Sequence, residues 1–134
     1  MKAVLFMIVL FPLAAFAGKT EREYMKNEVK PAVEAAEKEF KAKCGCALKI
    51  KINESTFKST DDMYQAKHTA NGVKDGCGGH CTDDDSKKAV CKMKNLEIAK
   101  GKETKFEFNG SKGTAWTDGS SYTSFEMMTA QLDK

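Results

Sequence analysis

Five cysteines and two histidines are the side chains of this sequence whose types could carry redox, metal or nucleophilic chemistry. The cysteines are Cys44, Cys46, Cys77, Cys81 and Cys91. In an exported chain such cysteines form structural disulfides, and an odd number leaves one of them unpaired. We therefore expect two disulfides and one free thiol, for which fifteen arrangements exist.

One disulfide is favoured by the alternation of apolar residues. Cys46 shares a face with Leu48, and Cys91 shares a face with Met93, in two stretches that have the period-two pattern of β-strands. Both cysteines would point at the core, from strands that can be neighbours. We predict a disulfide between Cys46 and Cys91.

The alternative reading of the same cysteines is a thiol or metal-binding protein. Its ligands would be Cys44, Cys46, Cys77, His80 and Cys81, which suit zinc or copper(I). Neither cluster has the two-residue spacing of a zinc knuckle, and an oxidising compartment competes for the thiols. Our leading expectation is therefore a protein without a metal or other cofactor.

No catalytic set stands out in the sequence. His68 and His80 are the two histidines, and neither lies in a known nucleophile motif. The Cys77 to Cys81 spacing is Cys-x3-Cys, which differs from the redox Cys-x-x-Cys motif. The run Asp83–Asp85 lacks the alternating ligand spacing of an EF-hand. We expect a protein that is not an enzyme and has no catalytic residues.

The first 17 residues have the anatomy of a cleaved secretory signal. Lys2 precedes an apolar run that ends in the small residues Ala15 and Ala17, and the run is too short to span a bilayer. We predict a signal peptide over residues 1–17 and a single globular α+β domain over residues 18–134. The protein would be secreted or periplasmic, with no membrane attachment after cleavage.

The charge pattern bears on possible partners. The chain has 134 residues, 31% of them charged, and a formal net charge of +3, with lysine and glutamate interspersed rather than separated. Nucleic-acid binding usually needs a concentrated basic face, so we expect no nucleic-acid partner. The sequons at Asn53 and Asn109 would carry glycans only in a eukaryotic secretory pathway.

These residues must be positioned by helices and strands. Thr20 and Glu23 form a capping-box pattern, which predicts a helix start. An apolar stripe follows at helical spacing, namely Met25, Val29, Val33, Ala36 and Phe40. Because Pro31 lacks an amide donor, we expect a kink there or a helix that begins near residue 31.

Beyond this helix, alternating residues predict strands around Leu48–Ile52, Ala89–Ile98 with a break near Asn95, Thr104–Phe108 and Thr114–Thr117. The turn signals Asn109-Gly110 and Asp118-Gly119 flank the last of these, so we predict three consecutive antiparallel strands joined by hairpins.

Between the first two predicted strands, Ser59–Asp62 resembles a helix start and Asn71-Gly72 a helix end. The glycine-rich, acidic stretch Asp75–Asp85 is predicted to be a loop. The tail from Tyr122 to Leu132 suits either a strand or a helix.

The predicted fold is α+β, with an N-terminal helix packed on a four- to five-stranded antiparallel meander and a helix-loop excursion after the first strand. This order is similar to cystatin-like folds in shape only, since the inhibitory loop signature Gln-x-Val-x-Gly is absent.

The functional expectation is a small exported, disulfide-stabilised binding or inhibitory module, whose partner is an unidentified protein or small ligand. An aromatic residue beside hairpin turns is a usual marker of a binding surface. We predict such a surface at Trp116, Asn109, Lys112, Asp118 and Tyr122.

Overall fold

The structure is a computed structural model, and it describes residues 18–134. The predicted signal peptide lies outside the described residues. The chain runs from helix 18–24 through the π-helical segment η1 (Met25–Val29) into α2 (Lys30–Cys44). The later elements are β1 (Lys49–Ile52), the 3-10 turn η2 (Glu54–Thr56), α3 (Thr60–His80), α4 (Asp84–Val90), β2 (Asn95–Lys100), β3 (Lys105–Asn109), β4 (Lys112–Thr117) and α5 (Phe125–Leu132).

The N-terminal helix is longer and more continuous than predicted. Residues 18–24 are already helical, so Thr20 lies inside the helix and is not its N-cap. The helix does not begin anew at Pro31. Instead the chain widens into the π-helical segment η1 directly before Pro31, where the Lys30 amide bonds to the Met25 carbonyl, and this widening accommodates a residue that lacks an amide donor. Gly45, with φ of 78°, ends α2 in the left-handed conformation.

Helix α3 begins where the sequence indicates but ends later. The Ser59 hydroxyl accepts a hydrogen bond from the Asp62 amide, as an N-cap does. The predicted stop at Asn71-Gly72 and the predicted loop from Asp75 are wrong, because the helix continues to His80. Gly76 allows close packing, because a Cβ there would lie 3.0 Å from the Phe125 ring. Packing against α5 therefore overrides the low helix propensity of glycine.

A second helix replaces part of the predicted strand before β2. Asp83 caps α4, its carboxylate accepting a hydrogen bond from the Ser86 amide at 2.8 Å. The acidic run is therefore a helix start rather than a loop. Cys91 follows α4 as its C-cap, and the strand begins only at Asn95, so the break predicted near that residue is the true start of β2.

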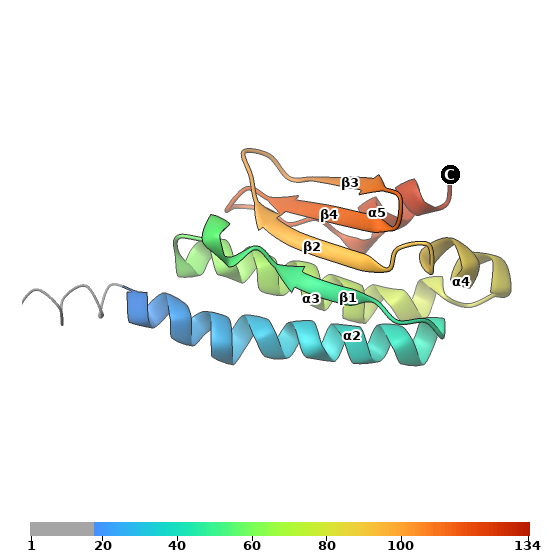
Figure 1. The fold of residues 1–134 in the computed structure, drawn as a ribbon, viewed down its shortest axis with the longest axis horizontal. Helices are drawn as coiled ribbons and strands as arrows, with labels where there is room; N and C mark the ends of the chain where they lie inside the picture. Colours follow the sequence, from blue (N-terminus) through green and yellow to red (C-terminus); the bar gives the residue numbers. More distant parts are fainter. Residues whose placement is uncertain (1–17) are drawn as a thin grey trace, which may run out of the picture.

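The sheet is mixed, and the predicted antiparallel meander is wrong. The strand order is β1-β2-β4-β3, with β1 parallel to β2, β2 parallel to β4, and β3 antiparallel to β4 (Figure 1). The parallel β1–β2 pair follows from the helical connection α3–α4 between these strands. The Asn109-Gly110 turn joins β3 and β4 as predicted, whereas Asp118-Gly119 leads into α5 and joins no strands. The topology is therefore not that of a cystatin-like meander.

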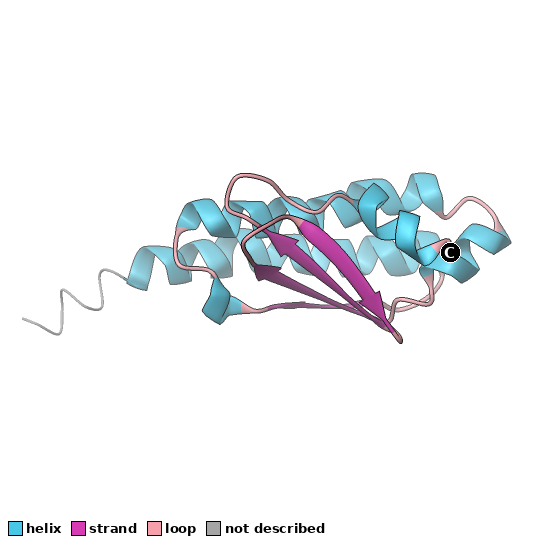
Figure 2. Cartoon of the chain, turned by 90° about the horizontal axis from the view of Figure 1, so that it is seen from above, coloured by secondary structure: helices cyan, strands magenta, loops and turns pink. Residues whose placement is uncertain are grey.

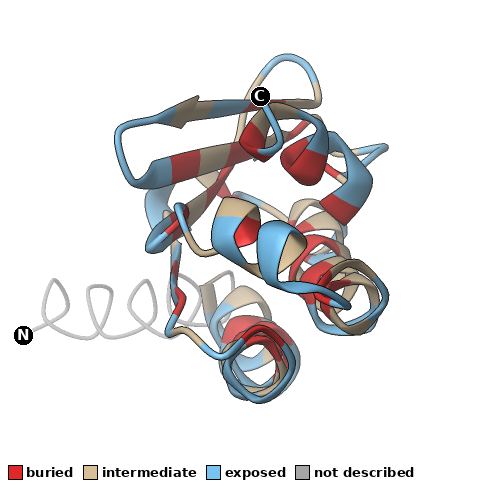
Figure 3. Cartoon of the chain, turned by 90° about the vertical axis from the view of Figure 1, so that its right-hand side faces the viewer, coloured by how far each residue is buried: buried red, intermediate tan, exposed pale blue. Residues whose placement is uncertain are grey.

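The helices cover one face of the sheet and leave the other open (Figure 2). Buried residues gather between the helices and the sheet (Figure 3). The largest fully buried side chains include Phe40 of α2, Val73 of α3, Ile98 of β2 and Leu132 of α5. The tail is thus helical, and its apolar stripe completes the core. No helix within residues 18–134 is long and apolar enough to span a membrane.

Candidate functional site

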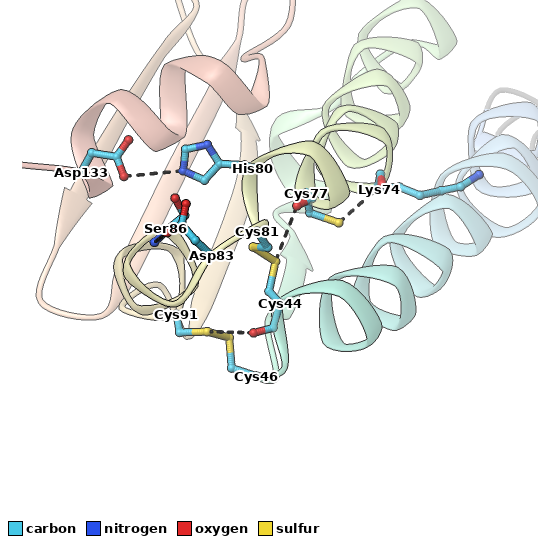
Figure 4. Close-up of a disulfide and its surroundings, with 10 residues drawn as sticks. All are labelled: Cys44, Cys46, Lys74, Cys77, His80, Cys81, Asp83, Ser86, Cys91 and Asp133. Carbon is cyan, nitrogen blue, oxygen red and sulfur yellow. Dashed lines mark hydrogen bonds and ion pairs between the residues drawn. A yellow bond between two sulfur atoms is a disulfide. The ribbon is translucent and has the colours of Figure 1, made fainter.

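The cysteines form two disulfides at the end of the molecule where α2 and α3 both stop (Figure 4). The predicted Cys46–Cys91 bridge is confirmed. Its rationale was partly wrong, because Cys91 lies at the end of a helix and not on a strand. The other bridge joins Cys44 to Cys81 and so ties the last turn of α2 to the residue after α3. The two bridges make this region a disulfide-stabilised module.

Cys77 is the free cysteine among the described residues, and it is buried. Its thiol lies 3.5 Å from the Lys74 carbonyl, one turn earlier on α3. Burial raises the pKa of the Cys77 thiol, and the nearby Glu39 carboxylate adds to that shift. A buried thiol that stays protonated at neutral pH is a poor nucleophile. The surroundings of Cys77 therefore fit a small apolar side chain that fills space in the core.

The alternative metal cluster is not assembled. Cys44, Cys46 and Cys81 are bonded in disulfides, so of the five proposed metal ligands Cys77 and His80 remain available. Within residues 18–134, no group of three or more histidine, cysteine or acidic side chains is arranged to hold a metal ion.

The two histidines lie in different environments, and both contact aromatic rings. His68 packs between Tyr64 and Tyr122, with ring centroids 4.3 and 5.3 Å away. The Nε2 atom of His80 lies 3.5 Å from the Asp133 carboxylate, and its ring meets Phe125 edge-on. Among the described residues, neither imidazole hydrogen-bonds to a cysteine, serine or threonine side chain.

The predicted binding residues separate into two groups. Asn109 and Lys112 are cross-strand neighbours, and Trp116 lies further along β4 on the same open face of the sheet. The Lys105 ammonium lies 5.0 Å from the centre of the Trp116 ring, a cation–π contact. Trp116 is half-buried, because it packs over Gly101.

Asp118 and Tyr122 lie apart from this face. The Asp118 carboxylate accepts hydrogen bonds from the Ser120 and Ser121 amides, which lower its pKa to about 2. Both hydrogen bonds lie within the turn at Asp118, so the carboxylate stabilises this turn. Tyr122 stacks on His68 of α3, on the helical side of the molecule. The structure therefore does not bring all five predicted residues into one surface.

A groove lies where α2 passes beside the edge strand β1. Two adjoining hollows of about 590 and 640 Å³ share Glu34, Glu37 and Lys49. We call the combined feature the α2–β1 groove; it is lined by Lys30, Val33, Glu34, Glu37, Lys38, Lys41, Cys46, Ala47, Leu48, Lys49, Ile50, Lys51, Ile52, Glu54, Lys94, Asn95, Leu96, Glu97 and Lys112. The predicted site residue Lys112 thus belongs to it.

The wall of the groove is the free edge of β1. The amides of Lys49 and Asn53 bond to the carbonyls of Lys94 and Ile98 beside β2, so the intervening even-numbered residues point their backbone groups away from the sheet. The Glu37 carboxylate accepts a hydrogen bond from the outward Ile50 amide at 2.7 Å. The outward groups of Ile52 have no hydrogen-bond partner among residues 18–134.

Lysines outnumber glutamates in the groove as a whole, although the hollow along Ile50–Ile52 has four of each. Seven lysines and four glutamates line the whole groove. Two pairs are joined, Lys30 to Glu54 at 3.7 Å and Lys112 to Glu97 at 3.0 Å. The Lys112 hydrogen bond, together with one from Asn53, lowers the pKa of Glu97. Of the lysines that line the groove, Lys38, Lys41, Lys49, Lys51 and Lys94 are exposed and have no carboxylate within 4 Å among residues 18–134.

Sequence reasoning missed this groove. The alternation around Leu48–Ile52 does place Lys49 and Lys51 on a solvent face, but it does not show that β1 lies at the edge of the sheet. That position depends on β4 pairing with β2, which no local pattern encodes. Comparisons with protein-family models, curated proteins and solved structures find no match to this chain.

Proposed function

We propose that the protein is a small exported binding or inhibitory module, not an enzyme, and that its binding site is the α2–β1 groove. The observation that carries the proposal is the free edge of β1, where the outward backbone groups of Ile52 lie unpaired inside the groove and the exposed Lys49 and Lys51 flank them. An unpaired strand edge is a ready template for a partner, and natural proteins usually block it.

The disulfides support the exported part of the proposal. Such bridges persist in oxidising compartments and are rare in the reducing cytosol. The apolar segment at residues 1–17 has the composition of a signal peptide, in agreement with a secreted or periplasmic location.

The surroundings of the histidines support binding over catalysis. General acid–base or nucleophilic catalysis needs a base within hydrogen-bond reach of its proton donor. The rings of His68 and His80 instead pack against Tyr64, Tyr122 and Phe125.

A pull-down from the native compartment tests the proposal. Wild type is compared with the double variant Lys49→Glu/Lys51→Glu and with a control, Lys58→Glu/Lys74→Glu, which makes the same charge change at exposed positions outside the groove. We expect the groove variant alone to lose its partner. Equal recovery by both variants would contradict the proposal, and loss with Trp116→Ala instead would move the site to the open sheet face.

A further inference from the structure

The geometry of the α2–β1 groove points to the class of its ligand, and this inference rests on the proposed function. We propose that the groove binds an extended acidic peptide, which adds to the edge of β1 as a further strand. Backbone pairing would supply affinity, and the alternating side chains of the peptide would supply specificity.

Backbone pairing is available at Ile52. Its amide and carbonyl point away from β2 and lack partners within residues 18–134. The neighbouring outward amide, that of Ile50, is occupied by the Glu37 carboxylate. Glu37 comes from α2 and is a side-chain acceptor, so it can be exchanged for a peptide carbonyl without unfolding the strand.

The side chains of β1 define the pattern of the peptide. Lys49 and Lys51 lie on the open face and are exposed, whereas Ile50 and Ile52 face the helices. A strand added beside β1 alternates its side chains in the same way. Its residues on the open face meet the two lysine ammonium groups, and those on the other face meet the apolar side chains of Ile52 and Val33. An alternating acidic and apolar sequence therefore fits.

The charge balance selects an acidic partner over a second copy of this chain. Beside Ile52 the groove has four lysines and four glutamates, and Glu54 and Glu97 are paired with Lys30 and Lys112, so Lys49 and Lys51 lack a carboxylate partner there. The excess of three lysines over the whole groove comes from Lys38, Lys41 and Lys94 in the adjoining hollow. Pairing two copies edge to edge would bring Lys49 and Lys51 of both copies together, which like-charge repulsion disfavours. An acidic peptide neutralises the same lysines and gains steering from them.

Fluorescence anisotropy with the oxidised protein tests the inference. The probe is a labelled peptide of about seven residues in which glutamate and valine alternate. We expect it to bind at least about tenfold more tightly than a peptide of the same composition with its glutamates and valines in two blocks. We also expect Lys49→Glu/Lys51→Glu to weaken binding about tenfold, and Lys58→Glu/Lys74→Glu to change it less than about twofold. Equal affinity for the two peptides would overturn the inference.

Two readouts test strand addition without relying on variants of the protein. In a strand, the amides of alternate residues point to opposite edges. N-methylation of all glutamate amides or of all valine amides should therefore abolish binding in one case only. Hydrogen exchange of the Ile52 amide should slow when the probe is bound. Equal effects of the two methylation patterns, or unchanged Ile52 exchange, would overturn strand addition.

Binding of anionic polymers tests whether charge attraction alone explains the affinity of the groove for the peptide. Heparin and single-stranded DNA should bind more weakly than the probe at physiological salt; tighter binding by either would overturn the peptide assignment. The failure of the inference is distinguishable from that of the proposed function. If the groove variant loses its native partner but the alternating peptide does not bind the wild-type protein, the peptide inference is overturned. The groove then remains the proposed binding site.

Discussion

The Glu37 carboxylate of α2 accepts a hydrogen bond from the Ile50 amide of β1 at 2.7 Å. At the opposite edge, the Gln131 side chain of α5 donates to the Phe106 carbonyl of β3. Each edge of the sheet is therefore partly blocked by a helix side chain, a common protection against uncontrolled pairing. At β1 the block covers the Ile50 amide and leaves the outward backbone groups of Ile52 open, and these groups are the centre of the proposed binding site.

Replacing Glu37 should expose the edge. Because Glu37→Ala removes the acceptor of the Ile50 amide, we expect the free energy of unfolding to fall by about 1 kcal/mol and the Ile50 amide to exchange faster. Glu37→Gln keeps an acceptor and should lose less. Urea unfolding and amide exchange by NMR measure the two effects. An Ile50 exchange rate that is unchanged in Glu37→Ala would show that this hydrogen bond does not protect the edge.

The Cys46–Cys91 disulfide should be a major source of stability. The bridge spans 45 residues, so its loss releases much chain entropy in the unfolded state. We expect Cys46→Ala and Cys91→Ala each to lower the free energy of unfolding by about 2–4 kcal/mol, and the double variant by little more. Urea midpoints measure the loss, which should shrink under reducing conditions. Additive losses that reductant leaves unchanged would indicate two independent core thiols.

Two glycines of α3 should respond in opposite ways to alanine. A Cβ at Gly76 would lie 3.0 Å from the ring and 3.1 Å from the Cβ atom of Phe125, whereas one at Gly79 meets nothing within 4 Å. We expect Gly76→Ala to lower the free energy of unfolding by about 1–2 kcal/mol through overpacking. Gly79→Ala should raise it by about 0.5–1 kcal/mol, because alanine is the better helix former. Thermal unfolding compares them, and stabilisation by both would mean that α5 shifts freely.

The turn at Asp118 should contribute to acid sensitivity. Its pKa is lowered from 3.8 to about 2 by the Ser120 and Ser121 amides. A carboxyl with a depressed folded pKa stabilises the fold fully above its unfolded pKa, and this contribution is lost as the pH falls from about 4 to about 2. We expect Asp118→Asn, which keeps an acceptor but does not titrate, to show a flatter stability profile across this window. Identical profiles of wild type and variant would contradict the assignment.

Local signals in the sequence were sufficient for β1, β3, β4 and the Ser59 cap. They also led to the Cys46–Cys91 bridge, although Cys91 ends a helix instead of lying on a strand. They failed where tertiary packing decides. Gly72 and Gly76 are typical of a helix end or a loop, yet both lie inside α3, and Gly76 sits where the Phe125 side chain of α5 approaches closely. The sheet order was also missed, because the pairing of β4 with β2 depends on where the α3–α4 connection places β2.

The candidate site was predicted in small part. Lys112 is common to the predicted surface and the groove, and Asn109 and Trp116 share its sheet face. The Asp118 carboxylate is hydrogen-bonded within its own turn, and Tyr122 stacks on His68 of α3. The lysines of β1 are unremarkable in the sequence, and they become significant only through the position of their strand at the sheet edge.

Site-specific photocrosslinking in the native compartment is the most direct test of the groove as the binding site. A benzophenone side chain is placed at position 51, inside the groove, and in separate proteins at positions 58 and 116. We predict that the partner is captured from position 51 and that its crosslinked residues come from an extended acidic segment. Capture from position 58 or 116, with none from position 51, would contradict the assignment of the groove.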